Sequence, residues 1–165
     1  MKTLILGGAR SGKSHVAEQL AQRSTGPVTY VATVRLNGDE NLERRVAEHR
    51  ERRPPTWSTV ECGDDLASIL ATVSGTVLVD SLGPWLAALP SMRCDLDALI
   101  SALRARRDDT MIVSEEVGLA VHPETAMGRE FRDNLGTLNQ AIAHECDDVV
   151  LVVAGRALSL PRFES

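Results

Sequence analysis

The sequence predicts an α/β fold in which helices cover both faces of a mainly parallel sheet. Short apolar segments alternate with helical patterns along the chain, and these segments are apolar throughout instead of alternating apolar with polar residues. Strands have this composition when both of their faces are buried, as in a parallel sheet covered by helices. With 165 residues, the chain is long enough to bury one sizeable core, and we expect a single domain over residues 1–165.

The expected strands are short runs rich in β-branched and other apolar residues, at positions 3–6, 28–33, 58–61, 76–80, 110–114 and 149–153. Helical patterns separate them at 14–24, 39–53, 64–73, 96–107 and 125–146, and we expect the last helix to break near Gly136. The helix at 39–53 is highly charged and stops at Pro54-Pro55, so it should lie on the surface. We expect mobile loops at 35–38 and 84–93 and little regular structure at 155–165. The order of the strands in the sheet does not follow from these patterns.

Composition and charge exclude several classes of function. Hydrophobic residues make up 43% and charged residues 25% of the chain, which is ordinary for a soluble globular domain. The net charge of −5 disfavours general nucleic-acid binding, and no apolar run approaches the ~20 residues of a membrane span. After Met1-Lys2 the chain lacks the long apolar segment of a signal peptide, so we expect a cytoplasmic protein. Cys62, Cys94 and Cys146 form no CxxC pair, which indicates neither a zinc site nor a disulfide framework.

The first expected strand runs directly into a phosphate-binding pattern. Residues 7–14 fit G-x-x-x-x-G-K-[ST] in full, with the sequence Gly7-Gly8-Ala9-Arg10-Ser11-Gly12-Lys13-Ser14. In such a loop the backbone N–H groups face phosphate oxygens, the lysine reaches the β- and γ-phosphates, and the serine hydroxyl binds Mg²⁺. The helix that follows adds its N-terminal dipole. The pattern therefore predicts a three-layer P-loop NTPase fold that takes ATP or GTP together with Mg²⁺.

The alternative, a glycine-rich turn that matches this pattern by chance, is disfavoured by two observations. The pattern lies between an expected strand and an expected helix, which is the context that a phosphate loop requires. One of only two lysines in the chain, Lys13, also falls at the lysine position of the pattern.

A phosphate loop also needs an acidic side chain across the site to hold Mg²⁺ through water. Asp80 is the first candidate because it directly follows the apolar run Val77-Leu78-Val79. Glu115 and Glu116, which follow the next apolar strand, are the alternative, and Glu116 joins Ser14 and Asp80 as a candidate metal ligand. If any one of these carboxylates has no functional role, it would instead cap a helix or be solvated.

His49 stands among positive charges. Five arginines lie within five residues of it, at positions 44, 45, 50, 52 and 53. Such a cluster would stabilise a polyphosphate, and a neutral imidazole beside it could attack phosphorus. From composition alone, however, a solvated charged helix with an incidental histidine is the better-supported interpretation.

Several segments together resemble one known family. They are the phosphate loop, Tyr30-Val31-Ala32-Thr33, Arg45-Val46-Ala47-Glu48-His49 running to Arg53-Pro54 and Trp57, Asp80-Ser81-Leu82-Gly83-Pro84-Trp85-Leu86, Glu116-Val117-Gly118, His122-Pro123-Glu124, Phe131-Arg132-Asp133 and Leu138-Asn139-Gln140. In this order they span nearly the whole chain and resemble the bifunctional adenosylcobinamide kinase/adenosylcobinamide-phosphate guanylyltransferase family of cobalamin biosynthesis. The phosphate loop alone is shared by many families, whereas the ordered set is far more specific.

The resemblance implies a corrinoid substrate and two reactions. ATP or GTP phosphorylates the aminopropanol hydroxyl of adenosylcobinamide. A histidine then attacks the α-phosphorus of GTP, releases pyrophosphate and holds GMP covalently until the cobinamide phosphate takes it. The nucleophile of the family falls on His49, and the nucleotide contacts fall on Gly7, Gly8, Ala9, Arg10, Ser11, Gly12, Lys13, Ser14, Thr33, Val34, Arg35, Arg50, Glu51, Arg52, Arg53, Glu61 and Asp80. The family also suggests a homo-oligomer, a trimer, with each corrinoid site near a subunit boundary.

Two segments depart from the family pattern, and two alternative functions stay open. Asp39-Glu40-Asn41-Leu42 replaces an acidic pair followed by Glu-Met, and Glu115 stands where the family has Asn before Glu-Val-Gly. One alternative is a monofunctional P-loop kinase that acts on a small molecule. The other is a GTP-dependent switch, which would normally carry Asn-Lys-x-Asp; that pattern is impossible here because no lysine follows Lys13.

Overall fold

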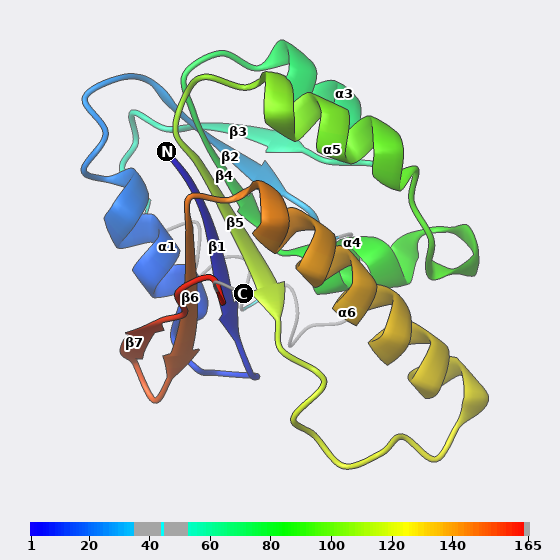
Figure 1. Ribbon diagram of the computed structural model, residues 1–165. Helices are drawn as coiled ribbons and strands as arrows, with labels where there is room; N and C mark the ends of the chain where they lie inside the picture. The colour runs from blue at the N-terminus through cyan, green and yellow to red at the C-terminus, as the bar shows by residue number, and fades with distance from the viewer. Residues whose placement is uncertain (35–43, 45–52, 164–165) are drawn as a thin grey trace.

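The computed structural model describes residues 1–34, 44 and 53–163. A single sheet of seven strands lies at the centre of this part of the chain (Figure 1). In chain order the strands are β1 (Lys2–Gly7), β2 (Val28–Ala32), β3 (Ser58–Glu61), β4 (Thr76–Asp80), β5 (Thr110–Glu115), β6 (Asp148–Val153) and β7 (Arg156–Ser159). Side by side in the sheet, their order is β3-β2-β4-β5-β1-β6-β7. Every neighbouring pair is parallel except β6 and β7. The predicted mainly parallel sheet is therefore confirmed.

Helices cover both faces of this sheet (Figure 1). The helix α1 (Lys13–Ala21) lies on one face. On the other face lie α3 (Leu66–Thr72), α4 (Leu82–Ala88), the short 3-10 helix η1 (Pro90–Met92), α5 (Leu96–Ala105) and α6 (Ala126–Glu145). The described residues thus form the three layers that the sequence predicts, and none of their helices is long and apolar enough to cross a membrane.

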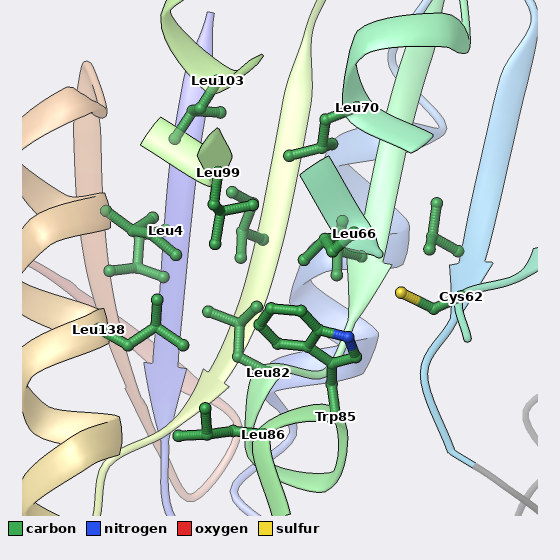
Figure 2. Close-up of a cluster of buried hydrophobic side chains, with 14 of the residues drawn as sticks. Leu4, Cys62, Leu66, Leu70, Leu82, Trp85, Leu86, Leu99, Leu103 and Leu138 are labelled. Carbon is green, nitrogen blue, oxygen red and sulfur yellow. The ribbon is translucent and has the colours of Figure 1, made fainter. Parts of the chain in front are cut away.

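Successive strand residues point to opposite faces and so build two cores. Ile5 and Leu78 pack in the core under α1, whereas their neighbours Leu4 and Val77 pack in a larger core on the other side. Figure 2 shows part of the larger core, where leucines of α3, α4, α5 and α6 belong to the same cluster as Trp85. Burial on both faces explains why the central strands are apolar throughout.

The parallel arrangement brings the carboxyl ends of the strands to one edge of the sheet. Gly7 at the end of β1 is paired with Glu115 at the end of β5. Ala32 at the end of β2 is paired with Asp80 of β4 on one side and with Glu61 of β3 on the other. The phosphate loop, which begins at Gly7, therefore shares this edge with three acidic strand ends. Ligands of open α/β sheets bind at this edge.

The prediction of a mobile loop at 84–93 is wrong, because most of this segment belongs to the helix α4 and the 3-10 helix η1. Leu82, Trp85, Leu86 and Leu89 have the spacing of one helix face, and all four are buried in the larger core. Pro84 does not prevent the helix, since it lies in the first turn, where its missing N–H group is not needed.

The tail at 155–165 also contains structure that the sequence did not predict. Residues 156–159 form β7, which pairs antiparallel with β6. Ala154 and Gly155 connect the two strands, with φ of 51° and 75°. Two successive positive φ values are typical of the tight turns that join hairpin strands. All four residues of β7 are exposed, so the strand has no apolar pattern by which it could be recognised.

The expected break near Gly136 does not occur, because α6 runs without interruption from Ala126 to Glu145. Its buried residues Leu135, Leu138 and Ile142 hold one face of the helix against the larger core, and this packing outweighs the weak helix propensity of glycine. The other strands and helices were predicted within a few residues of their ends. Of the expected helix at 39–53, only Arg44 and Arg53 are described, and the expected loop at 35–38 lies outside the described residues.

Candidate functional site

The phosphate loop turns tightly between β1 and α1 because two of its positions require glycine. A Cβ on Gly7 would overlap the Ser11 hydroxyl and lie 2.8 Å from the Val152 carbonyl oxygen. Gly12, the N-cap residue of α1, has a φ of 94°, a left-handed backbone that favours glycine. The Ser11 N–H group donates to the Gly8 carbonyl at 3.3 Å and closes the turn. The first turn of α1 follows directly, as a site for phosphate requires.

Lys13 lies at the start of α1 with its ammonium turned back toward the loop. Its Nζ donates to the Gly8 carbonyl at 3.3 Å and lies 3.4 Å from Glu115 Oε1. The side chain is only 12% exposed. The ammonium therefore sits beside the loop, where it can reach the phosphates of a nucleotide.

Asp80 joins the loop to the neighbouring strand β2. Its Oδ1 accepts a hydrogen bond from the Ser14 hydroxyl at 3.1 Å, and its Oδ2 accepts one from the Tyr30 hydroxyl at 3.0 Å. Burial, and then the charge of Asp80, raise the pKa of Tyr30 well above its ordinary value. Tyr30 therefore remains a protonated donor across the neutral pH range.

The hydroxyl of Ser14 and the carboxylate of Asp80 are oxygen donors of the kind that Mg²⁺ prefers. In the described residues no three His, Cys, Asp or Glu side chains come together as a metal cage. Mg²⁺ bound with a nucleotide usually takes most of its ligands from substrate phosphates and water. The two side chains thus fit the predicted metal role.

Thr33 and Glu61 lie at the same edge of the sheet. The Thr33 hydroxyl donates to the Ser81 carbonyl at 2.7 Å, and its backbone N–H donates to the Asp80 carbonyl at 3.4 Å. These bonds tie the segment after β2 to the end of β4. Val34 follows half-buried, and Glu61 is exposed at the end of β3. Their predicted contacts with a nucleotide stay predictions.

The two glutamates after β5 have different surroundings. The Glu115 carboxylate accepts hydrogen bonds from the Ser81 hydroxyl at 2.8 Å and from the Gly83 N–H group at 2.9 Å, beside Lys13. The Glu116 carboxylate accepts the N–H group of Gly118 at 2.6 Å, within its own turn. The structure therefore brings Glu115 to the lysine of the loop, and the metal role of Glu116 stays a prediction.

Several predicted site residues lie outside the described residues, namely Arg35, His49, Arg50, Glu51 and Arg52. Arg53, four positions after His49, is described. Its guanidinium carbon lies 3.3 Å from the centroid of the Tyr30 ring, a cation–π contact. The end of the arginine-rich segment is thus attached to the tyrosine that binds Asp80.

Sequence reasoning missed the roles of Tyr30, Ser81 and Gly83, which it placed only in matching segments. One signal could have pointed to Tyr30. A tyrosine inside an apolar strand is expected to be buried, and a buried hydroxyl needs a polar partner. The contact of Gly83 with Glu115 carries no such signal, because it depends on how α4 leaves the sheet.

A solved structure of similar fold supports the architecture. An ATPase of the type III secretion system of pathogenic bacteria has a TM-score of 0.54 and 12% sequence identity, covering 91% of this chain and 51% of that chain. At this identity the likeness concerns the fold alone, and it agrees with a P-loop α/β domain.

Sequence comparison identifies the family. The bifunctional adenosylcobalamin biosynthesis protein CobP of Pseudomonas aeruginosa is 42% identical to this chain over 171 residues, which cover 97% of each protein. The bifunctional adenosylcobalamin biosynthesis protein CobU of Escherichia coli is 32% identical over 177 residues, with 94% of this chain and 97% of that protein covered. Residues 3–160 match the family described as cobinamide kinase / cobinamide phosphate guanyltransferase. The chain therefore belongs to the cobinamide kinase / cobinamide phosphate guanyltransferase family.

Proposed function

We propose that this chain binds the magnesium complex of ATP or GTP at residues 7–14 and carries out both reactions of its family on a corrinoid. It first phosphorylates the aminopropanol hydroxyl of adenosylcobinamide and then transfers GMP from GTP to the resulting phosphate. The observation that carries the proposal is the phosphate loop itself, whose Lys13 and Ser14 lie against Glu115 and Asp80 in a chain of this family.

Ser14 and Asp80 would hold Mg²⁺, with Asp80 acting through water. The bound cation would neutralise part of the phosphate charge. Lys13 would neutralise charge on the β- and γ-phosphates, and the N–H groups of the loop would orient them. Phosphoryl transfer needs little else from the protein, because positioning and electrostatic stabilisation provide most of its catalysis.

GMP transfer through a covalent intermediate requires a nucleophile of the protein, and we assign this role to His49. Its imidazole nitrogen attacks the α-phosphorus of GTP, the bond to the β-phosphate oxygen breaks, and pyrophosphate leaves. An oxygen of the cobinamide phosphate then attacks the same phosphorus and releases the histidine. The contact of Arg53 with Tyr30 supports this assignment, since it ties the end of the His49 segment to Asp80 and Ser14.

We also propose that the chain acts in the cytoplasm, where nucleoside triphosphates are available, and that it assembles as a trimer with the corrinoid site near a subunit boundary. Apolar side chains on and near the β6–β7 hairpin are well exposed, with Val153 at 61%, Leu158 at 60% and Phe163 at 96%. Exposed large apolar side chains favour contact with another protein surface where they gather on one face. Light scattering after size-exclusion chromatography would measure the mass, and a monomeric mass would contradict the trimer.

The decisive experiment is labelling with GTP that carries a radioactive α-phosphate. Without corrinoid, the wild-type chain should release one pyrophosphate and retain the label in a bond that is lost in acid and stable in base. His49→Ala should remain unlabelled but keep phosphorylating adenosylcobinamide. His144→Ala, which alters an exposed histidine at the end of α6, should label like the wild type.

Each other outcome selects a different function. Label on the His49→Ala variant would assign the nucleophile to another residue. An unlabelled wild-type chain that phosphorylates the corrinoid would be the monofunctional kinase. Continuous hydrolysis of GTP to GDP without corrinoid would indicate the switch protein.

A further inference from the structure

Lys13 and Glu115 form a shielded ion pair at the phosphate loop. Their Nζ and Oε1 atoms are 3.4 Å apart, and the side chains are only 12% and 25% exposed. Water and salt screen such a pair less than they screen a pair on the surface. Lys13 also donates to the Gly8 carbonyl, so the protein itself holds the ammonium that a nucleotide would recruit. A triphosphate must replace these contacts when it binds.

Glu115 is fixed in place and cannot follow Lys13. Ser81 and Gly83 each donate a hydrogen bond to its carboxylate, and its backbone carbonyl accepts the side-chain amide of Asn139 at 3.0 Å. A Cβ on Gly83 would overlap the Glu115 carboxylate, so the carboxylate fills the space that the glycine leaves open. The negative charge therefore stays at the loop whether Lys13 contacts it or not.

We propose that Glu115 is a positioning residue that makes triphosphate binding depend more strongly on Mg²⁺. Its fixed charge retains Lys13 in the nucleotide-free enzyme and opposes a triphosphate that arrives without a cation. The inference rests on the nucleotide site proposed at residues 7–14. It goes beyond that proposal because it gives Glu115 a role that is separate from holding the metal.

The charges around the loop explain the effect. Lys13 is a cation of this site, and it faces the carboxylate of Glu115 while the buried carboxylate of Asp80 lies beside Ser14. A metal-free triphosphate adds its full negative charge to this arrangement, whereas bound Mg²⁺ cancels part of it. A neutral amide at position 115 could still accept the Gly83 hydrogen bond, and it would release Lys13 for the phosphates. Metal-free binding should then improve far more than binding of the magnesium complex.

The test measures dissociation constants of a fluorescent methylanthraniloyl-GTP in EDTA and in saturating Mg²⁺. Glu115→Gln should bind the analogue about tenfold more tightly in EDTA, which is the scale for removing one charge from a partly buried site. Its affinity in Mg²⁺ should change much less. The ratio of the dissociation constant in EDTA to that in Mg²⁺ should therefore fall. Asp97→Asn removes the same charge from an exposed position on α5 and should leave the ratio unchanged.

A second variant displaces the charge without removing it. Gly83→Ala should push the Glu115 carboxylate away from Lys13 and lower the same ratio. The proposal is overturned if both variants keep the wild-type ratio. It is also overturned if both lose affinity equally with and without Mg²⁺, since that is the result of structural damage. A wild-type chain that binds no analogue at all would instead refute the nucleotide site.

Discussion

Replacing Tyr30 with phenylalanine tests whether the buried tyrosine supports the acid of the site. The variant removes the hydroxyl that donates to Asp80 Oδ2 at 3.0 Å and keeps the ring under Arg53. A hydrogen bond to a charged group contributes about 1.5–3 kcal/mol, and we expect the free energy of unfolding to fall by that amount. For a chain of this length the fall in Tm would be about 3–12 °C.

The pKa of Tyr30 decides the pH range of this effect. Because the folded-state pKa is raised, the stabilisation is fully present below the unfolded value of about 10 and is lost only as the pH rises above it. The difference between variant and wild type should therefore be constant across the neutral range in thermal unfolding. A difference that grows or shrinks near neutral pH would mean that another group is responsible.

The Tyr30→Phe variant should need a higher Mg²⁺ concentration for half-maximal GTP binding, because Asp80 loses one of the groups that orient it. Ser24→Ala is the control, since it removes a neutral hydrogen bond of 2.6 Å to Thr76 and should cost only about 1 kcal/mol. It should leave the Mg²⁺ dependence unchanged. If Tyr30→Phe costs no more than Ser24→Ala and has the same Mg²⁺ dependence as wild type, the hydroxyl does not orient Asp80.

Three further variants test the loop, the metal and the long helix. Lys13→Ala should lower both half-reactions by more than about tenfold, or 1.4 kcal/mol, and survival of either rate would show that the two reactions do not share the loop. Asp80→Ala should raise the Mg²⁺ requirement or weaken nucleotide binding in a titration, and no change in either would shift the role to Glu116. Gly136→Ala should raise the free energy of unfolding by about 0.5–1 kcal/mol, because an added Cβ meets no atom within 4 Å inside a continuous α6; a lower Tm would contradict this.

The central strands β1, β2, β4 and β5 were predictable because burial on both faces leaves them apolar, whereas the missed elements lack such a pattern. The spacing of Leu82, Trp85, Leu86 and Leu89 is visible in the sequence, but this short segment was predicted as a loop, and packing against the larger core holds it as a helix. The exposed strand β7 is stabilised by its pairing with β6, which composition does not reveal. The strand order depends on such long-range pairing throughout.

The candidate site divides in the same way. The phosphate loop and Asp80 could be predicted because each is defined by its local sequence, a glycine pattern in one case and the end of an apolar run in the other. The contact of Glu115 with Lys13 requires β5 to lie beside β1, where Gly7 is paired with Glu115. Contacts that depend on the strand order cannot be predicted from a single sequence, even when the residues have the chemistry that the site needs.

The two proposed reactions can share one loop because both build up charge on the groups that the loop holds. In phosphorylation the γ-phosphoryl group leaves the β-phosphate, and in GMP transfer pyrophosphate leaves the α-phosphate. Lys13 lies where it would stabilise either leaving group.

The attacking groups differ, since the corrinoid hydroxyl must reach the γ-phosphorus and His49 must reach the α-phosphorus, nearer the nucleoside. Arg53 attaches the His49 segment to Tyr30 on β2, which is separated from β1 by the two strands β4 and β5. Under the proposed mechanism the hydroxyl and the histidine therefore do not compete for one position, and one phosphate loop is sufficient for both steps.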